Sequence, residues 1–455
     1  MMKFSTVCKK LIWVLVFLGH NLGISQAKGE ENTFKLRSDV VSDKLNFKLV
    51  NNLIVIPVSI NGQELSFILD TGVSSTIIFS LGNDKELQLS NATKINLRGL
   101  GDGDPVEAIK SQGNILAIGN AISTNHTVFL IFDETIDFSP RMGLPIHGII
   151  GYDFFKNFIL DIKYSKKTIK IIEPSGYVWK YCKKCFETKL DFNDGVRPYI
   201  KAKYGLDNKI DINLLVDSGS GSALWLFENK ELGINIPEHS FREFLGKGFN
   251  GDIYGSRSKI DALHIGKFKM QRVTASFPDS IYIPGISINQ RQGSLGGGVL
   301  KRFDLIVDYP NQKISFKKNR FFKMPFYYNL SGITIEHTGE RLTKVLTREG
   351  KIDYQGVRRR KTVSTPIVID YTFGYRYSME PNFQIVNVRP GSPAALAGLQ
   401  AGDRILSINR KKAYEYELDA INTLFFNNEG KRIRMTVERS GVILDYSFLL
   451  KKVID

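Results

Sequence analysis

The stretch FILDTGVSSTIIF, Phe67–Phe79, holds an Asp-Thr-Gly triplet between two apolar runs. Asp, Thr and Gly all favour turns for local backbone reasons, so one triplet predicts no more than a turn between strands. The sequence contains a partner for it, INLLVDSGSGSALWLF, Ile212–Phe227, in which Asp217 takes the place of Asp70. The pairing of these two stretches decides the fold.

Two further features repeat at nearly the same spacing. Ile118-Gly119 recurs as Ile265-Gly266, and GIIGYDFF from Gly148 recurs as GSLGGGVL from Gly293. Matched positions are about 145 to 147 residues apart. Coincident turns would not keep a common offset, so the first three hundred residues contain an internal duplication. Each half is expected to hold a strand, the triplet, a Gly-rich hairpin, a strand ending in Ile-Gly, an apolar-Gly segment with a short helix, and closing strands.

This order of elements resembles the pepsin/retropepsin superfamily of aspartic proteases over roughly residues 45–318. The resemblance implies a mainly β fold, in which two acid-protease β-barrel lobes each supply one Asp loop to a shared cleft. It makes Asp70 and Asp217 the candidate catalytic dyad. Two carboxylates about 3 Å apart share one proton, so one can accept a proton from water while the other donates to the scissile carbonyl.

The residues next to the two acids are expected to support them. As the resemblance implies, Thr71 and Ser218 link the two loops by hydrogen bonds. Small residues let backbone amides approach the carboxylates. The supporting residues are Thr71, Gly72, Ser218, Gly219 and Ser220.

The sequence departs from the pepsin pattern three residues after the first Asp. Pepsin-like enzymes carry Ser or Thr there, whereas this chain has Val73 in the first half and Ser220 in the second. Fewer hydrogen bonds to a carboxylate raise its pKa, so we expect a mildly acidic to neutral pH optimum. Ser294 and the glycines Gly296–Gly298 have little side-chain volume for a segment that should pack beneath the second Asp loop. A second lobe that is weakened or inactive is therefore one interpretation.

Each half also carries a Gly-rich hairpin, LRGLGDGDPVE (Leu97–Glu107) and LGKGFNGDIYG (Leu245–Gly255). Glycines permit positive φ and mobile tips, and the hairpins occupy corresponding places in both halves, so we expect flaps over the cleft. The predicted flap residues are Gly99, Gly101, Gly103, Gly246 and Gly248.

The last third of the chain has a different character. FQIVNVRPGSPAALAGLQAGDRILSINR, Phe383–Arg410, resembles a PDZ domain of the bacterial envelope-protease type, an α+β, partly open barrel. Such a domain binds an extended or C-terminal peptide as an added strand, and the alternative is a domain that only packs against the lobes. We expect the carboxylate-binding loop at Ser331, Gly332 and Ile333, with Tyr371–Tyr377 as the other candidate. A basic insertion near 340–367 would follow, for which disorder is one interpretation.

The N-terminus reads as an export signal. Lys3, Lys9 and Lys10 precede the apolar run Leu11–Leu18, and Ser25–Ala27 offers small residues for cleavage. No later run of about 18 apolar residues follows, so we expect a periplasmic or secreted chain without a stable membrane anchor. The predicted domains are a signal peptide (1–27), protease lobes (28–180 and 181–320) and the PDZ domain (321–455).

The charge and the cysteine content limit which binding partners and ligands we expect. The net charge of +16 is spread along the chain without a nucleic-acid motif, so a solvated basic surface and no nucleic-acid partner are expected. Cys182 and Cys185 remain after signal removal, and in an oxidising compartment they could close a small disulfide. No second cysteine pair completes a zinc site, and we predict no metal and no cofactor.

We therefore predict an exported aspartic endopeptidase acting on peptides or unfolded proteins, with the PDZ domain binding substrate tails or a partner. The alternative is a catalytically silent envelope protein that uses the cleft and the PDZ groove for recognition. Two intact triplets argue against the silent version. Cleavage specificity, a propeptide and the oligomeric state are left open by one sequence.

Overall fold

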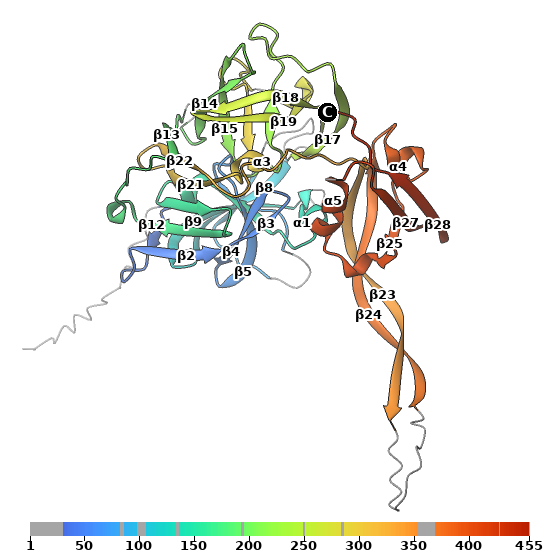
Figure 1. Ribbon diagram of the computed structural model, residues 1–455. Coiled ribbons are helices and arrows are strands. Elements are labelled where there is room, and N and C mark those ends of the chain that lie inside the picture. Colours follow the sequence, from blue (N-terminus) through green and yellow to red (C-terminus); the bar gives the residue numbers. More distant parts are fainter. Residues whose placement is uncertain are drawn as a thin grey trace, which may run out of the picture.

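The computed structural model describes residues 31–81, 86–97, 106–132, 136–192, 195–248, 251–283, 286–352, 369–426 and 428–454. The predicted signal peptide at 1–27 lies outside these residues, as do the predicted flap glycines Gly99, Gly101 and Gly103. Strands dominate the described chain, which confirms the mainly β fold (Figure 1). Among the described helices, none is both long and apolar enough to cross a bilayer.

The first lobe is built on a nine-stranded sheet in the order β1-β9-β6-β10-β5-β4-β8-β7, with β3 paired to β4. Helix α1 (Ser139–Met142) precedes β10 and helix α2 (Tyr152–Phe155) follows it. The strands are β1 (Lys35–Leu36), β3 (Lys48–Val50), β4 (Leu53–Ile60), β5 (Gln63–Leu69), β6 (Thr76–Ile78), β7 (Ala92–Leu97), β8 (Val106–Ile118), β9 (Ala121–Ile131) and β10 (Gly148–Ile150).

The second lobe has a seven-stranded sheet in the order β14-β15-β20-β16-β19-β18-β17. Its short helix α3 (Gly297–Leu300) follows β20. The strands are β14 (Tyr199–Tyr204), β15 (Ile210–Asp217), β16 (Leu224–Leu226), β17 (Ser240–Gly248), β18 (Gly251–Ile265), β19 (Phe268–Pro278) and β20 (Gly293–Gly296).

The two lobes repeat the same strand pairings. β10 runs parallel to β5 and antiparallel to β6, and β20 runs parallel to β15 and antiparallel to β16. β6 is parallel to β9, and β16 is parallel to β19. The duplication inferred from the sequence is therefore confirmed at the level of strand pairing.

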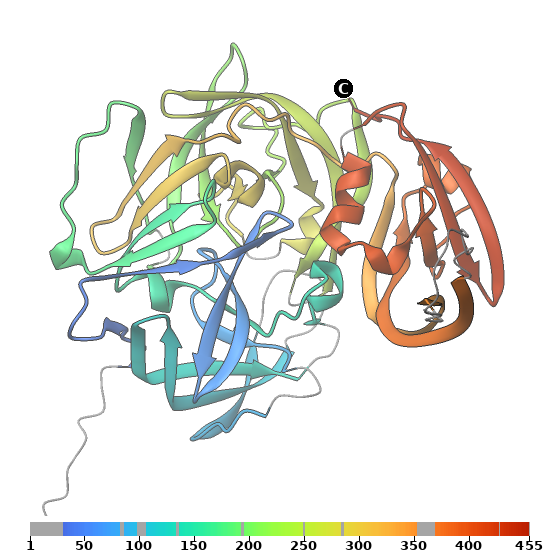
Figure 2. The ribbon, with the colours of Figure 1, turned by 60° about the horizontal axis from the view of Figure 1, so that its bottom comes forward.

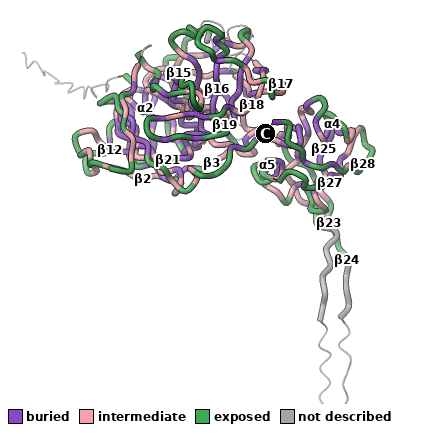
Figure 3. Tube along the Cα trace, turned by 45° about the horizontal axis from the view of Figure 1, so that its top comes forward, coloured by how far each residue is buried: buried purple, intermediate pink, exposed green. Residues whose placement is uncertain are grey.

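A third sheet joins the lobes, in the order β13-β22-β21-β11-β12-β2. β11 of the first half pairs with β21 of the second, and buried residues of both halves form one core (Figure 3). The strands are β2 (Ser42–Asn46), β11 (Ile159–Lys163), β12 (Thr168–Ile172), β13 (Cys185–Lys189), β21 (Phe303–Asp308) and β22 (Lys313–Lys318). Because this sheet crosses the lobe boundary, it fixes the two Asp loops relative to one another.

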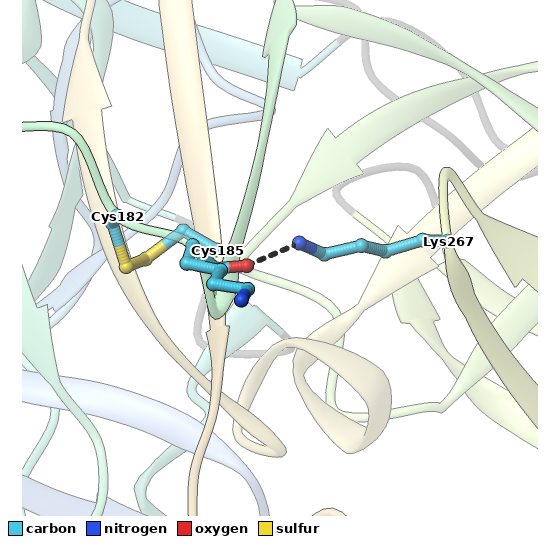
Figure 4. Close-up of a disulfide and its surroundings, with 4 residues drawn as sticks. Cys182, Cys185 and Lys267 are labelled. Atoms are coloured by element: carbon cyan, nitrogen blue, oxygen red, sulfur yellow. Dashed lines mark hydrogen bonds between the residues drawn. A yellow bond between two sulfur atoms is a disulfide. The ribbon is translucent and has the colours of Figure 1, made fainter.

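A disulfide joins Cys182 to Cys185 where the chain enters β13 (Figure 4). Beside it, Lys267 Nζ donates a hydrogen bond of 2.8 Å to the backbone oxygen of Lys183. The small disulfide considered from the sequence is thus present, and the bond from Lys267 attaches its loop to the β18–β19 turn.

The C-terminal domain is a six-stranded sheet with its own apolar core. The strand order is β23-β24-β25-β27-β28, with β26 on β25, and the helices are α4 and α5. The elements are β23 (Ile333–Ile352), β24 (Ile369–Val388), α4 (Pro393–Leu396), β25 (Arg404–Ile408), β26 (Lys411–Lys412), α5 (Leu418–Phe426), β27 (Arg432–Arg439) and β28 (Val442–Leu449). Ser392 caps α4 by accepting a hydrogen bond from the Ala395 amide, as expected where Ser precedes Pro at a helix start.

The expected insertion forms a hairpin. β23 and β24 pair from Ile333↔Val388 to Ile352↔Ile369, so the two strands continue far beyond the domain (Figure 1). Disorder is therefore wrong for 340–352, because this segment is paired throughout, while 353–367 lies outside the described residues. The alternative loop at Tyr371–Tyr377 is also wrong, since that segment lies within β24, near its start, and is paired with β23.

The C-terminal domain is attached to both protease lobes. Arg389 donates to Glu243 of β17 over 3.1 Å, and its guanidinium lies 4.2 Å from the ring centroid of Phe241. On the other side, Arg141 of α1 donates to Glu336 of β23 over 2.6 Å. The PDZ-like domain thus contacts α1 of the first lobe and the β17–β18 hairpin of the second.

Candidate active site

The two Asp-Ser/Thr-Gly triplets meet between the lobes and are joined by four crossing hydrogen bonds. The Thr71 amide donates to Ser218 Oγ and the Ser218 amide donates to Thr71 Oγ1, each over 3.0 Å. The Thr71 hydroxyl donates to the Val216 carbonyl over 2.6 Å, and the Ser218 hydroxyl donates to the Leu69 carbonyl over 2.8 Å. Every hydroxyl therefore has a donor and an acceptor in the opposite lobe, which locks the two loops together.

Asp70 follows β5 and Asp217 ends β15. The two carboxylates lie next to each other in the cleft. The Gly72 amide donates to Asp70 Oδ1 over 2.6 Å. A Cβ on Gly72 would lie 3.1 Å from Asp70 Oδ1 and 3.2 Å from Asp217 Oδ1, so the two carboxylates flank one glycine. A Cβ on Gly219 would overlap the Asp70 carboxylate. Gly219 is required because the Asp70 carboxylate leaves no room for a side chain there, and a Cβ on Gly72 would fit only tightly between the two carboxylates.

The electrostatics of the pair favour a shared proton. Burial, and next the charge of Asp217, raise the pKa of Asp70 to about 7. Burial also raises the pKa of Asp217, but the guanidinium of Arg291 and the backbone amide of Ser220 act in the opposite direction. Two like charges at such a distance cannot both ionise cheaply. One carboxyl of the pair therefore keeps its proton near neutral pH.

Reasoning from the sequence missed Arg291 and Arg197, and it placed Ser294 beneath the second loop without predicting its bond to Asp217. Arg291 donates to Ser294 Oγ over 2.6 Å, and the Ser294 hydroxyl bonds to Asp217. Arg197 donates to the Gly72 carbonyl over 3.1 Å. A comparison of the two halves could have indicated Ser294, because it replaces the apolar Ile149 of the matching segment.

The expectation of loose packing beneath the second loop is wrong. All four residues of β20 and all of α3 are buried. A Cβ on Gly296 or Gly297 would overlap a backbone oxygen, of Ser222 in one case and Asn52 in the other. Glycine is needed at these positions because the chain packs tightly against the second Asp loop at Gly296 and against the first lobe at Gly297.

A cavity of about 1240 Å³ contains both candidate acids. Val73 and Ser220 line it, and so do the predicted flap residues Gly246 and Gly248 on β17. The hairpin of β17 and β18 is thus at the cleft, while the tip of the first hairpin lies outside the described residues. Among the described residues, no cluster of three or more His, Cys, Asp or Glu side chains could hold a metal ion.

The predicted peptide-binding loop directly precedes β23. Gly332 has φ +83°, a value that L side chains rarely adopt, and its carbonyl accepts a hydrogen bond from the Arg389 amide. The Ser331 carbonyl accepts from the Ala394 amide, which ties the loop to α4. Ile333 begins β23 and lines the same cavity as the two acids.

Two protein families match parts of the chain. Residues 56–154 match the aspartyl protease family, and residues 384–439 match the PDZ domain family. These matches place a retropepsin-like aspartyl protease domain in the first lobe and a PDZ domain near the C-terminal end of the chain. Among solved structures, the aspartic proteinase from Irpex lacteus is similar at a TM-score of 0.39 and 13% identity, over 62% of this chain and 99% of that chain. No curated protein matches the chain.

Proposed function

We propose that the mature chain is an exported aspartic endopeptidase that hydrolyses peptide bonds with water activated between Asp70 and Asp217. The observation that carries this proposal is the position of both carboxylates around Gly72, on loops cross-linked through Thr71 and Ser218. The aspartyl protease match supports peptide hydrolysis as the reaction class. The apolar segment at Leu11–Leu18, preceded by lysines, supports export.

The chemistry follows from the different surroundings of the two acids. Asp217, beside Arg291, is the carboxylate that accepts a proton from water. Asp70 carries the proton and donates it to the scissile carbonyl oxygen as the water attacks. When the tetrahedral diol collapses, Asp217 gives its proton to the nitrogen of the leaving amine and Asp70 takes one back from the diol hydroxyl, so each acid returns to its starting state. The expected substrate is an unfolded or extended peptide, because an extended backbone exposes each carbonyl to the attacking water.

The test uses the purified mature chain with an unfolded protein and a peptide library, beside the variants Asp70→Asn and Asp217→Asn. Cleavage by the wild type that is lost in both variants supports the proposal. Cleavage that persists in either variant places the chemistry elsewhere, and the absence of wild-type cleavage from pH 3 to 8 overturns the enzyme assignment. N-terminal sequencing of the chain recovered outside the cytoplasm tests export, with a start near residue 28 as the expected result.

A further inference from the structure

The sheets of the two lobes present corresponding rows of side chains to the cleft. Figure 2 shows the lobes as separate halves, the first in blue to teal and the second in green to yellow. Directly paired residues on neighbouring strands lie side by side on one face of a sheet. In the first lobe, the register aligns Ile68, Ile149, Ile77 and Phe129 across β5, β10, β6 and β9. In the second lobe, the same pairings align Leu215, Ser294, Trp225 and Ser276 across β15, β20, β16 and β19.

The row of the first lobe is apolar, whereas the row of the second lobe carries polar groups. Corresponding positions hold Ser294 for Ile149, Trp225 for Ile77 and Ser276 for Phe129. The next strand extends the contrast, because Lys110 of β8 pairs with Phe129 and Arg257 of β18 pairs with Ser276. Arg257 lines the cavity, and Lys110 is not among the described residues that line it. One wall of the cleft is therefore apolar and the other is polar.

Two donors in the polar row lack an acceptor. Trp225 Nε1 and Ser276 Oγ are buried and have no hydrogen-bond partner among the described residues. An indole N–H can only donate, and a hydroxyl can turn its hydrogen toward an anion. Trp225 lines the cavity, with Ser276 paired directly to it. The partial positive charges of these two groups are thus not balanced within the wall.

The charged side chains of this wall add to its positive character. Glu243 lies between two guanidiniums: Arg257 donates from Nε to one carboxylate oxygen, and Arg389 donates to the other over 3.1 Å. One carboxylate between two arginines leaves one positive charge. The Arg257 side chain is 16% exposed, so water screens that charge poorly. Arg291 lies at the other end of the row and donates to Ser294 Oγ over 2.6 Å.

We propose that the second-lobe wall selects substrates with an acidic side chain, Asp or Glu, next to the cleaved bond, and that the first-lobe wall takes an apolar side chain on the other side of that bond. This inference rests on the proposed protease function and adds which peptides are cleaved. Each row begins two residues before one of the candidate acids, at Ile68 and at Leu215. Successive side chains of an extended peptide point in opposite directions, so the two residues that flank the cleaved bond face opposite lobes. Arg257 is the residue that specifies the acidic side chain, because a guanidinium fits a carboxylate through paired N–H donors.

The test uses peptides of one cleavable sequence, in which Glu replaces Gln at each of the two positions beside the cleaved bond in turn. At one position, the ratio of kcat/KM for Glu over Gln at pH 6 is expected to be about tenfold, equivalent to about 1.4 kcal/mol. At the other position the ratio should be below one, with Leu preferred to both. The tenfold ratio should fall as the pH drops below about 4, where the substrate Glu becomes neutral. A ratio near one at both positions overturns the inference.

Variants assign the preference to the wall. Arg257→Gln is expected to bring the ratio close to one, and Trp225→Phe, which removes the N–H, should lower it about threefold. Lys110→Gln changes the corresponding residue of the first lobe and is the matched control that should keep the ratio. Arg257→Lys keeps the charge without the planar group and should keep part of the ratio. Cleavage of a peptide with Leu at both positions shows that each variant is folded. An unchanged ratio in Arg257→Gln overturns the inference.

Two further measurements separate this preference from other causes. A peptide with its only Glu five residues from the cleaved bond should gain little, and an equal gain would overturn the inference in favour of general attraction to the basic chain. If the wild type cleaves nothing, the proposed function fails, but fluorescence anisotropy with the labelled Glu and Gln peptides still tests the wall. Tighter binding of the Glu peptide, lost in Arg257→Gln, supports the inference, and equal binding overturns it.

Discussion

The guanidinium of Arg291 donates a 2.6 Å hydrogen bond to Ser294 Oγ, and the Ser294 hydroxyl bonds to Asp217. The first half has Ile149 at the position of Ser294, so Asp70 has no equivalent of this arrangement. Two lobes with the same strand pairings therefore give their acids different surroundings. The positive charge of Arg291 therefore acts to lower the pKa of Asp217, against the effect of burial.

Replacing Arg291 is expected to shift the acid limb of the pH–activity profile upward. The positive charge lowers the pKa of Asp217, so Arg291→Gln raises that pKa, and the carboxylate is lost at a higher pH. A shift of about one pH unit corresponds to about 1.4 kcal/mol. The measurement is kcat/KM from pH 3 to 8. Arg291→Lys should shift the limb less, and Arg432→Gln, at the exposed first residue of β27, should not shift it. An acid limb that moves downward would contradict the assignment.

The alkaline limb of the pH–activity profile reports the pKa of Asp70. Because the pKa of Asp70 is raised to about 7, activity should fall as the pH rises through about 7, when the dyad loses its last proton. Val73→Thr supplies a hydroxyl that can bond the ionised form, which lowers this pKa and moves the alkaline limb down by about one unit. Val73→Ala is the matched control without a hydroxyl. An alkaline limb that moves upward in Val73→Thr would refute this reasoning.

The crossing hydrogen bonds between the loops should contribute to stability. In Thr71→Val the shape is kept, but the Val216 carbonyl and the Ser218 amide lose their buried partner. Urea unfolding should show a loss of about 3 kcal/mol, since each unsatisfied buried group costs about 1 to 3 kcal/mol. Thr71→Ser should recover most of it, and Thr93→Val, at an exposed site, should change little. Equal stability of Thr71→Val and wild type would show that the crossing bonds do not hold the lobes.

The sequence predicts the protease fold and the two acids because both depend on local pattern. Asp70 and Asp217 follow apolar strands at the offset shared by other repeated features, so the duplication is visible without a structure. Arg291 could not be predicted, since its role depends on how a loop before β20 folds back onto Asp217. The same holds for Arg141, whose contact with Glu336 joins segments 195 residues apart. Such contacts arise from packing between lobes and domains.

The loop beneath the PDZ groove shows the same limit on a smaller scale. Gly332 could be selected from the sequence because a glycine between small and apolar residues indicates a turn with positive φ. That Asn329 satisfies the neighbouring amides depends on the rotamer of its side chain, which no pattern of residue types specifies. The turn at Gly332 was predictable, and the hydrogen bonds of the amides beside it were not.

The contact between Arg389 and Glu243 should couple the PDZ domain to the β17–β18 hairpin. The two side chains are 6% and 18% exposed and lie 3.1 Å apart, and Glu243 also contacts Arg257 of β18. A double-mutant cycle with Arg389→Met and Glu243→Gln should give a coupling of about 1 to 3 kcal/mol in urea unfolding. Hydrogen exchange at Phe241–Gly248 should rise in each single variant, because the hairpin loses its attachment. The exposed pair Lys94–Glu107, in the other lobe, is the control and should show much weaker coupling. A coupling at Arg389 and Glu243 no larger than in the control, with exchange unchanged, would mean that the PDZ domain does not hold the hairpin over the cleft.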